Sequence, residues 1–138
     1  MWWIFALLSA LFAALTAVLA KVGVKGVDSN LATAVRTVVV LVLAWGIVIA
    51  RGSLGQLHSL TRTNWLFLGL SGVATGLSWI FYFRALQLGK VSQVAPVDKL
   101  SVALAIVLSI VFLGEKLTWQ AGVGATLIIM GTLVLIWE

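Results

Sequence analysis

The sequence contains no cysteine, one proline, one histidine and very few charged residues. The absence of cysteine excludes disulfides, thiolate metal sites and cysteine nucleophiles. A lone histidine, His58, gives no basis for a metal site. Charged residues make up 9% of the 138 residues, against about 25% in ordinary soluble domains. We therefore expect neither a metal nor a cofactor. The low share of charged residues also indicates that most of this chain is surrounded by a solvent other than water.

Long apolar runs take up most of the chain, which is 62% hydrophobic. A domain this small leaves much of its surface exposed, so lipid is the solvent that would stabilise such a composition. A helix needs about 20 residues to cross the hydrocarbon core, and lipid offers no hydrogen-bond partner to the backbone, which excludes open strands and loops. The sequence predicts an all-α, integral membrane bundle of five transmembrane helices in one domain, residues 1–138. The predicted spans are 2–20, 30–50, 64–88, 92–114 and 117–137. The first run lacks a basic n-region and exceeds a typical signal-peptide core, so we interpret it as a retained span.

Local signals predict where several spans begin and end. Residues 28–30 supply an N-cap for the second span, and Thr63 or Asn64 supplies one for the third. Gly89 is expected to end the third span as a left-handed cap. The turn Gly114-Glu115-Lys116 is so short that the spans on either side of it should form an antiparallel hairpin.

Basic side chains are nearly balanced between the two sides of the predicted membrane. The side of the N-terminus carries Arg51, Arg62 and Lys116, and the other side carries Lys21, Lys25 and Lys90, with Arg84 if it snorkels. The positive-inside rule requires a bias, and this difference is hardly one. One hypothesis is that the protein inserts in both orientations and pairs with an inverted copy. The alternative is a fixed orientation set by the insertion machinery or a partner. The basic residues are scattered singly, so we expect no nucleic-acid partner.

Four motifs in the second half of the sequence resemble a known family of transporters. They are Tyr82–Gly89 (YFRALQLG), Val91–Pro96 (VSQVAP), Phe112–Thr118 (FLGEKLT) and Gly122–Gly131 with its Leu127-Ile128-Ile129 core. These stretches resemble the EamA family of the drug/metabolite transporter superfamily. The resemblance implies a carrier of small molecules in a bacterial-type inner (plasma) membrane. Most members have ten spans built as two inverted five-span repeats, and this chain resembles one repeat. An inverted homodimer would rebuild the ten-helix unit, with substrate near the midplane at the repeat interface.

Charged residues inside the spans are the candidate substrate residues. Arg36 lies about seven residues inside the second span, where an unpaired cation costs a few kcal/mol or more. It could line the substrate cavity, snorkel to the interface, or pair with an acid. Asp98 and Lys99 follow Pro96, which removes a backbone donor and kinks helices. Adjacent helical residues point about 100° apart, so we expect at most one of the two to face a cavity. A gate or binding site there competes with a simple helix start near the headgroups.

An aromatic stripe adds Trp79, Tyr82 and Phe83 at helical spacing, with Trp45 on the preceding span. Such a stripe suits an organic substrate through apolar and cation–π contacts, although simple packing has the same pattern. Glu115 and Lys116 are expected to serve the turn rather than transport.

Three classes of function remain open on the sequence alone. The first is a secondary carrier or exporter of small organic metabolites. A four-span multidrug exporter mechanism is excluded because it depends on an acid in the first span, which has none. The second class is a non-transporting membrane partner, or a half-subunit of a heterodimeric transporter. The third, an intramembrane enzyme, lacks paired carboxylates or a Ser–His arrangement.

Overall fold

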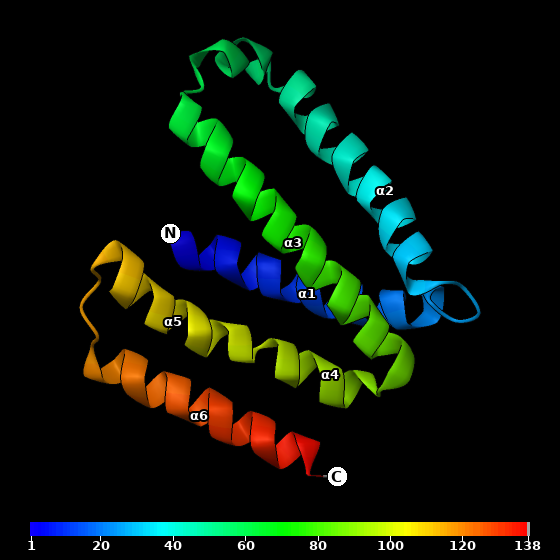
Figure 1. The fold of residues 1–138 in the computed structure, drawn as a ribbon, viewed down its shortest axis with the longest axis vertical. Coiled ribbons are helices and arrows are strands. Elements are labelled where there is room, and N and C mark those ends of the chain that lie inside the picture. Colours follow the sequence, from blue (N-terminus) through cyan, green and yellow to red (C-terminus); the bar gives the residue numbers. More distant parts are fainter. Residues whose placement is uncertain (138) are drawn as a thin grey trace. The chain divides into compact units, whose positions relative to one another are not determined.

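The computed structural model describes residues 1–137, and over these residues it contains helices and short connections only. The helices are α1 (Trp2–Gly23), α2 (Ser29–Ala50), the 3₁₀ helix η1 (Ser53–Ser59), α3 (Arg62–Leu88), α4 (Val91–Asp98), α5 (Leu100–Leu113) and α6 (Trp119–Ile136) (Figure 1). Five segments are long and apolar enough to cross a membrane: α1, α2, α3, Val91–Leu113 and α6. The predicted all-α fold with five spans is confirmed.

Very few apolar side chains are buried within the chain. Among the described residues, the buried hydrophobic side chains are Ala17, Val24, Phe83 and Leu86. Apolar surface left in water costs about 25 cal/mol for each Å², and here it covers most of every span. The helices therefore present their apolar faces to lipid or to another chain.

The chain forms two compact units, which we describe separately. The central unit is Leu19–Gln87, and the terminal unit combines Met1–Val18 with the chain from Leu88 onward. The central unit holds the end of α1, all of α2 and η1, and nearly all of α3. The terminal unit holds most of α1 with α4, α5 and α6.

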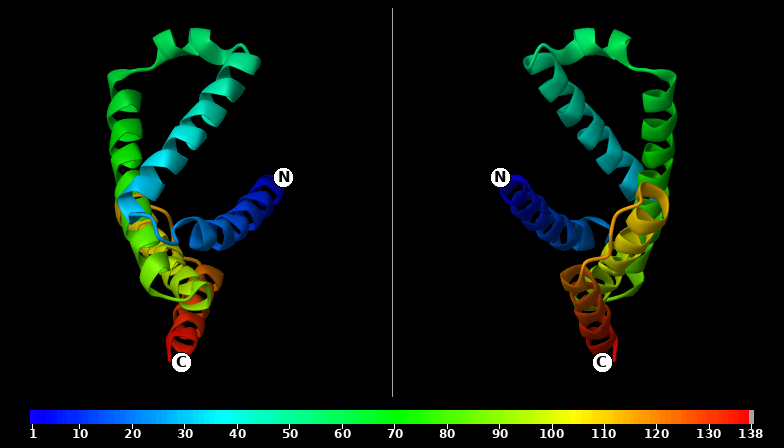
Figure 2. Two further views of the ribbon diagram at one scale, coloured as in Figure 1. Left: turned by 90° about the vertical axis from the view of Figure 1, so that its right-hand side faces the viewer. Right: turned by 90° about the vertical axis from the view of Figure 1, so that its left-hand side faces the viewer.

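In the central unit, α2 and α3 form a pair joined by η1. Asp28 caps α2 as predicted, because its carboxylate accepts hydrogen bonds from the N–H groups of Asn30 and Leu31, both at 3.0 Å. The predicted cap of α3 is wrong by two or more residues. Thr61 supplies it, accepting from the N–H of Asn64 at 3.2 Å. Helix α3 therefore begins at Arg62, and α2 and α3 diverge from their close end toward η1 (Figures 1 and 2).

The close end of this helix pair is held by a group of side chains that we call the clasp: Lys21, Arg84 and Gln87. The contacts are Lys21 Nζ to Leu86 O, Gln87 Nε2 to Val24 O (3.1 Å) and Val27 O (2.6 Å), and Arg84 Nη1 to Gln87 Oε1 (3.1 Å). The last carbonyls of a helix have no partner inside the helix, and Lys21 supplies one for the end of α3. The clasp ties the α1–α2 connection to the end of α3.

In the terminal unit, Pro96 precedes a break in the fourth predicted span. Proline has no N–H and its ring crowds the preceding turn, yet α4 continues through Pro96. The helix is interrupted three residues later, at Lys99, where α4 gives way to α5. The N–H of Lys99 is shared between the carbonyl of Ala95 (3.3 Å), its regular α-helical acceptor, and the closer carbonyl of Pro96 (3.0 Å). The N–H of Val102 bonds to Lys99 O (3.0 Å), so the backbone tightens here to bonds of the 3₁₀ type. The kink at Pro96 itself stays a prediction, and the structure has a break three residues further on.

Helices α5 and α6 lie side by side, as the short connection predicts (Figures 1 and 2). Gly114 ends α5 with a left-handed backbone (φ 67°), and its N–H and that of Glu115 both bond to Ser109 O. The connection is longer than expected, because Thr118 caps α6 and the helix begins at Trp119. The left-handed cap predicted at Gly89 is wrong: the positive-φ glycines are Gly26, Gly52 and Gly114. The extended Lys90 that starts α4 makes the turn after α3 without one.

Candidate functional site

The charged site of the central unit is built on Arg36. This residue lies seven positions after Ser29, so it is about 10 Å along a helix that rises 1.5 Å per residue. Trp79 and Phe83 lie at a comparable distance from the end of α3, four residues apart on one face. The clasp holds the two ends together, and this brings Arg36 beside both aromatic side chains.

The guanidinium of Arg36 lies over both aromatic rings. Its central carbon is 4.5 Å from the centroid of the Trp79 ring and 4.4 Å from that of the Phe83 ring. Both distances are well inside the roughly 6 Å range of cation–π attraction, which strengthens as the pair loses water. Phe83 is buried, and Arg36 and Trp79 are half-buried. Two residues of the predicted aromatic stripe, Trp79 and Phe83, therefore contact Arg36 directly.

No acid pairs with Arg36 among the described residues. Its Nη1 atom is buried and makes no hydrogen bond. Asp28, the acid of the central unit, is engaged as the cap of α2. The ion pair found in the described part of the chain joins Asp98 and Lys99, in the terminal unit. A buried charged donor without a partner is costly, so structural pairing with an acid does not explain Arg36.

Tyr82 extends the aromatic group beside the Arg36 contact. Its ring packs edge-on against the Phe83 ring, with centroids 5.7 Å apart and planes at 67°, a favourable geometry for aromatic pairs. Trp45, the residue of the preceding span that was grouped with the aromatic stripe, lies nine residues further along α2 than Arg36. Its side chain is exposed. The aromatic side chains beside Arg36 thus come from α3.

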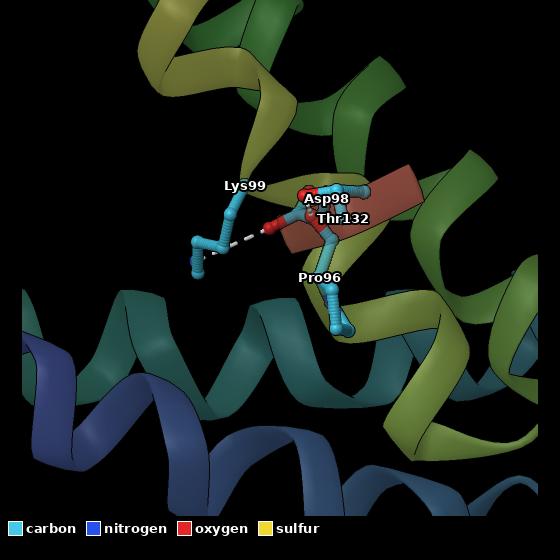
Figure 3. A network of polar contacts seen from close by, with 4 residues as sticks. All are labelled: Pro96, Asp98, Lys99 and Thr132. Carbon is cyan, nitrogen blue, oxygen red and sulfur yellow. Dashed lines mark hydrogen bonds and ion pairs between the residues drawn. The ribbon is translucent and has the colours of Figure 1, made fainter. Parts of the chain in front are cut away.

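Three candidates belong to the terminal unit: Pro96, Asp98 and Lys99 (Figure 3). Lys99 Nζ lies 3.3 Å from Asp98 Oδ2, and both side chains are partly exposed. We expected the two adjacent side chains to diverge. They meet because Lys99 stands where the helix breaks and its long side chain reaches back. Such an exposed pair contributes little to stability.

Pro96 is also linked to α6 through its carbonyl. The hydroxyl of buried Thr132 lies 3.2 Å from Pro96 O and 2.8 Å from Ile128 O, so its single proton is shared between two acceptors. The break in the fourth span is thereby anchored to the last helix.

Sequence reasoning missed two residues that position these groups. Gln87 stands within a sequence motif but gives no separate signal, yet its amide donates the hydrogen bonds to Val24 O and Val27 O that form much of the clasp. Thr132 gave no signal, because threonine is common on apolar helices and its partner is 36 residues away in the chain. A polar residue near a helix end, as Gln87 is, could have been found by asking where the connection's carbonyls are satisfied.

Comparison with known proteins places the chain among transporters. The sequence model of the EamA-like transporter family matches residues 1–137. A protein of Sinorhizobium sp, described as an uncharacterized transporter in the cobO 3′ region, is 50% identical over 134 residues. The alignment covers 97% of this chain and 95% of that protein. No solved structure matches the chain.

Proposed function

The chain belongs to the EamA-like transporter family, and from this premise we propose that it is a secondary carrier of small organic metabolites. It is a multi-pass membrane protein, and its substrates would cross the bilayer past the site formed by Arg36, Trp79 and Tyr82. Transport across a bacterial-type inner membrane completes the proposal.

The observation that carries this proposal is Arg36 itself. A cation about a third of the way along a membrane-length helix, held over two aromatic rings and with no acidic partner in residues 1–137, is costly if its role is structural alone. Ionisable groups within membrane spans commonly mark substrate or ion pathways, where water or substrate compensates for lost hydration. The break after Pro96 supports the same proposal, since interrupted helices in carriers expose backbone groups to substrate.

We further propose that two copies of the chain pair with inverted orientations. The number of spans is odd, the basic loop residues are nearly balanced, and the apolar faces of the spans are exposed. An inverted pair would cover part of that apolar surface and would provide ten spans. Pro96, Asp98 and Lys99 would then act as a gate beside the substrate path of each copy.

Flux through purified protein tests the transport proposal. Liposomes containing the full chain, preloaded with a panel of radiolabelled organic acids, amines and neutral metabolites, should release at least one class faster than protein-free liposomes. Release that equals the protein-free rate for every class would contradict the proposal and favour a non-transporting partner.

Labelling of a single introduced cysteine tests the orientation, because the chain has no native cysteine. In Gln56→Cys the thiol would lie on η1, where the native side chain is exposed. A membrane-impermeant maleimide applied to intact spheroplasts should label about half of the molecules. Labelling of all or none of them would mean one fixed orientation. Mass measurement in native lipid would separate the homodimer from a heterodimer with a second chain.

A further inference from the structure

The central unit carries the whole net formal charge of the protein. Its basic residues are Lys21, Lys25, Arg36, Arg51, Arg62 and Arg84, and its one acid is Asp28. Six positive charges and one negative charge give this unit +5, which equals the formal charge of the whole chain. The unit therefore attracts anions. Among its cations, Arg36 is the one that lies well inside a span.

The aromatic contacts of Arg36 leave its buried Nη1 without an acceptor among the described residues. A guanidinium interacts with aromatic rings through its faces and with oxyanions through its in-plane N–H groups, which fit two oxygens side by side. Trp79 and Phe83 lie at the ring-stacking distance and take no hydrogen bond from it. The buried Nη1 has no acceptor. Rings therefore contact the faces of the guanidinium, while its Nη1 lacks the in-plane acceptor that an oxyanion would supply.

The residues around Arg36 also indicate what kind of ligand would fit there. Beside the guanidinium lie the rings of Trp79 and Phe83, and the Tyr82 ring packs against Phe83. No acid of the described residues forms an ion pair with Arg36. A cationic ligand would meet an uncompensated positive charge in a medium that screens poorly. A neutral apolar ligand would leave the N–H groups unsatisfied. An organic anion satisfies both groups at once.

We propose that Arg36 binds the carboxylate of an organic acid substrate, whose apolar or aromatic body packs against Trp79 and Tyr82. The inference rests on the proposed transport function and adds its substrate class. The carboxylate supplies the acceptor for Arg36 Nη1 and neutralises the cation as the substrate passes. Trp79 and Phe83 hold the guanidinium in place, so that its N–H fork is already oriented when the acid arrives.

Three planar probes of nearly equal shape test this proposal: benzoate, benzamide and benzamidinium, which carry charges of −1, 0 and +1. Binding of each is measured on the full chain in nanodiscs of zwitterionic phosphatidylcholine. Wild-type protein should bind benzoate at least tenfold more tightly than benzamide, a difference of about 1.4 kcal/mol. Benzamidinium should bind least of the three.

Variants of Arg36 separate a binding role from a structural one. Arg36→Gln should abolish the preference for benzoate over benzamide, and Arg36→Lys should keep only part of it, because an ammonium is not a planar fork. Arg62→Gln removes the same charge from an exposed position at the start of α3 and should leave the preference unchanged. The ratio of affinities is the decisive readout, since a variant that merely unfolds loses all three probes together.

Two results would overturn the inference. One is equal binding of benzoate and benzamide by wild-type protein. The other is a benzoate preference that survives in Arg36→Gln. If the flux experiment succeeds while either occurs, the transport function stands and only the substrate class is wrong. If benzoate binds as expected and no panel compound is released, the transport function fails and the anion site remains.

The anion could also come from a lipid headgroup, which offers phosphate oxygens to the same N–H groups. Nanodiscs that contain phosphatidylglycerol distinguish this source. Benzoate affinity should fall little, and equally in wild-type protein and Arg62→Gln. An anionic lipid that displaces benzoate from wild-type protein, while leaving residual binding to Arg36→Gln unchanged, would identify the ligand as a lipid and contradict the proposal of a soluble substrate.

Discussion

Replacing Gln87 by methionine should loosen the central unit at its most connected polar residue. Methionine has a similar length but neither a donor nor an acceptor of comparable strength. The change removes two hydrogen bonds donated to Val24 O and Val27 O and one accepted from Arg84. The close end of α2 and α3, and with it the contact of Arg36 with its aromatic neighbours, depends on these bonds.

The size of the effect follows from the surroundings of each bond. An intramolecular hydrogen bond contributes about 1 kcal/mol net, so three would contribute about 3 kcal/mol at most. The bonds to Val27 O and from Arg84 are exposed, and water replaces much of their contribution. Val24 is 4% exposed, and its carbonyl loses a partner that water replaces poorly. We therefore expect the free energy of unfolding to fall by about 1–2 kcal/mol.

Unfolding in mixed micelles with increasing SDS measures this loss. Gln56→Met is the matched control, because Gln56 lies exposed on η1 and outside the clasp. Gln87→Glu separates the contacts further: it keeps the acceptor for Arg84 but places a carboxylate against two carbonyls. It should therefore destabilise at least as much as Gln87→Met. If Gln87→Met unfolds like Gln56→Met, or if Gln87→Glu is as stable as wild-type protein, the clasp does not hold the helix ends.

Three further changes have expected outcomes by the same unfolding measurement. Thr132→Val keeps the buried shape but removes the hydroxyl shared with Pro96 O, and should cost about 1 kcal/mol; no loss would mean that the hydroxyl does not anchor the break. Gly114→Ala should cost about 1 kcal/mol or more, because its φ of 67° disfavours a side chain, whereas Gly55→Ala, where the backbone is unstrained and the space is open, should cost little. Asp28→Ala should cost about 1 kcal/mol through loss of the helix cap, and Asp28→Asn should restore most of it; equal losses in the two variants would contradict a capping role.

Much of the fold was predictable because lipid enforces it. Each span is a run of apolar residues long enough to cross the bilayer, and a backbone in lipid has few choices other than a helix. The predicted spans agree within three residues at each end with the five membrane-length segments, the fourth of which is divided into α4 and α5. The boundaries that failed depended on local hydrogen bonds. Thr61 rather than Thr63 caps α3, because the cap is chosen by the backbone geometry and not by residue type alone.

The residues of the candidate site could be predicted from the sequence, whereas their contacts could not. Arg36 and Trp79 stood out as a cation and an aromatic side chain within apolar spans. Their contact joins residues 43 positions apart in the chain, and no local pattern encodes such a distance. Asp98 and Lys99 show the reverse error, since regular helical geometry separates them and the break after Pro96 lets them pair.

The amino-acid sequence by itself determined the solvent of this protein, its helical class and its family, since those follow from composition, from the lengths of apolar runs and from short motifs. Tertiary structure alone decided which rings meet the guanidinium, which carbonyls the clasp satisfies, and that the buried Nη1 is left without an acceptor. The physical reason is the distance along the chain over which each interaction acts. Solvent preference and helix formation act over neighbouring residues, whereas a charge site depends on the packing of helices that the chain brings together only when folded.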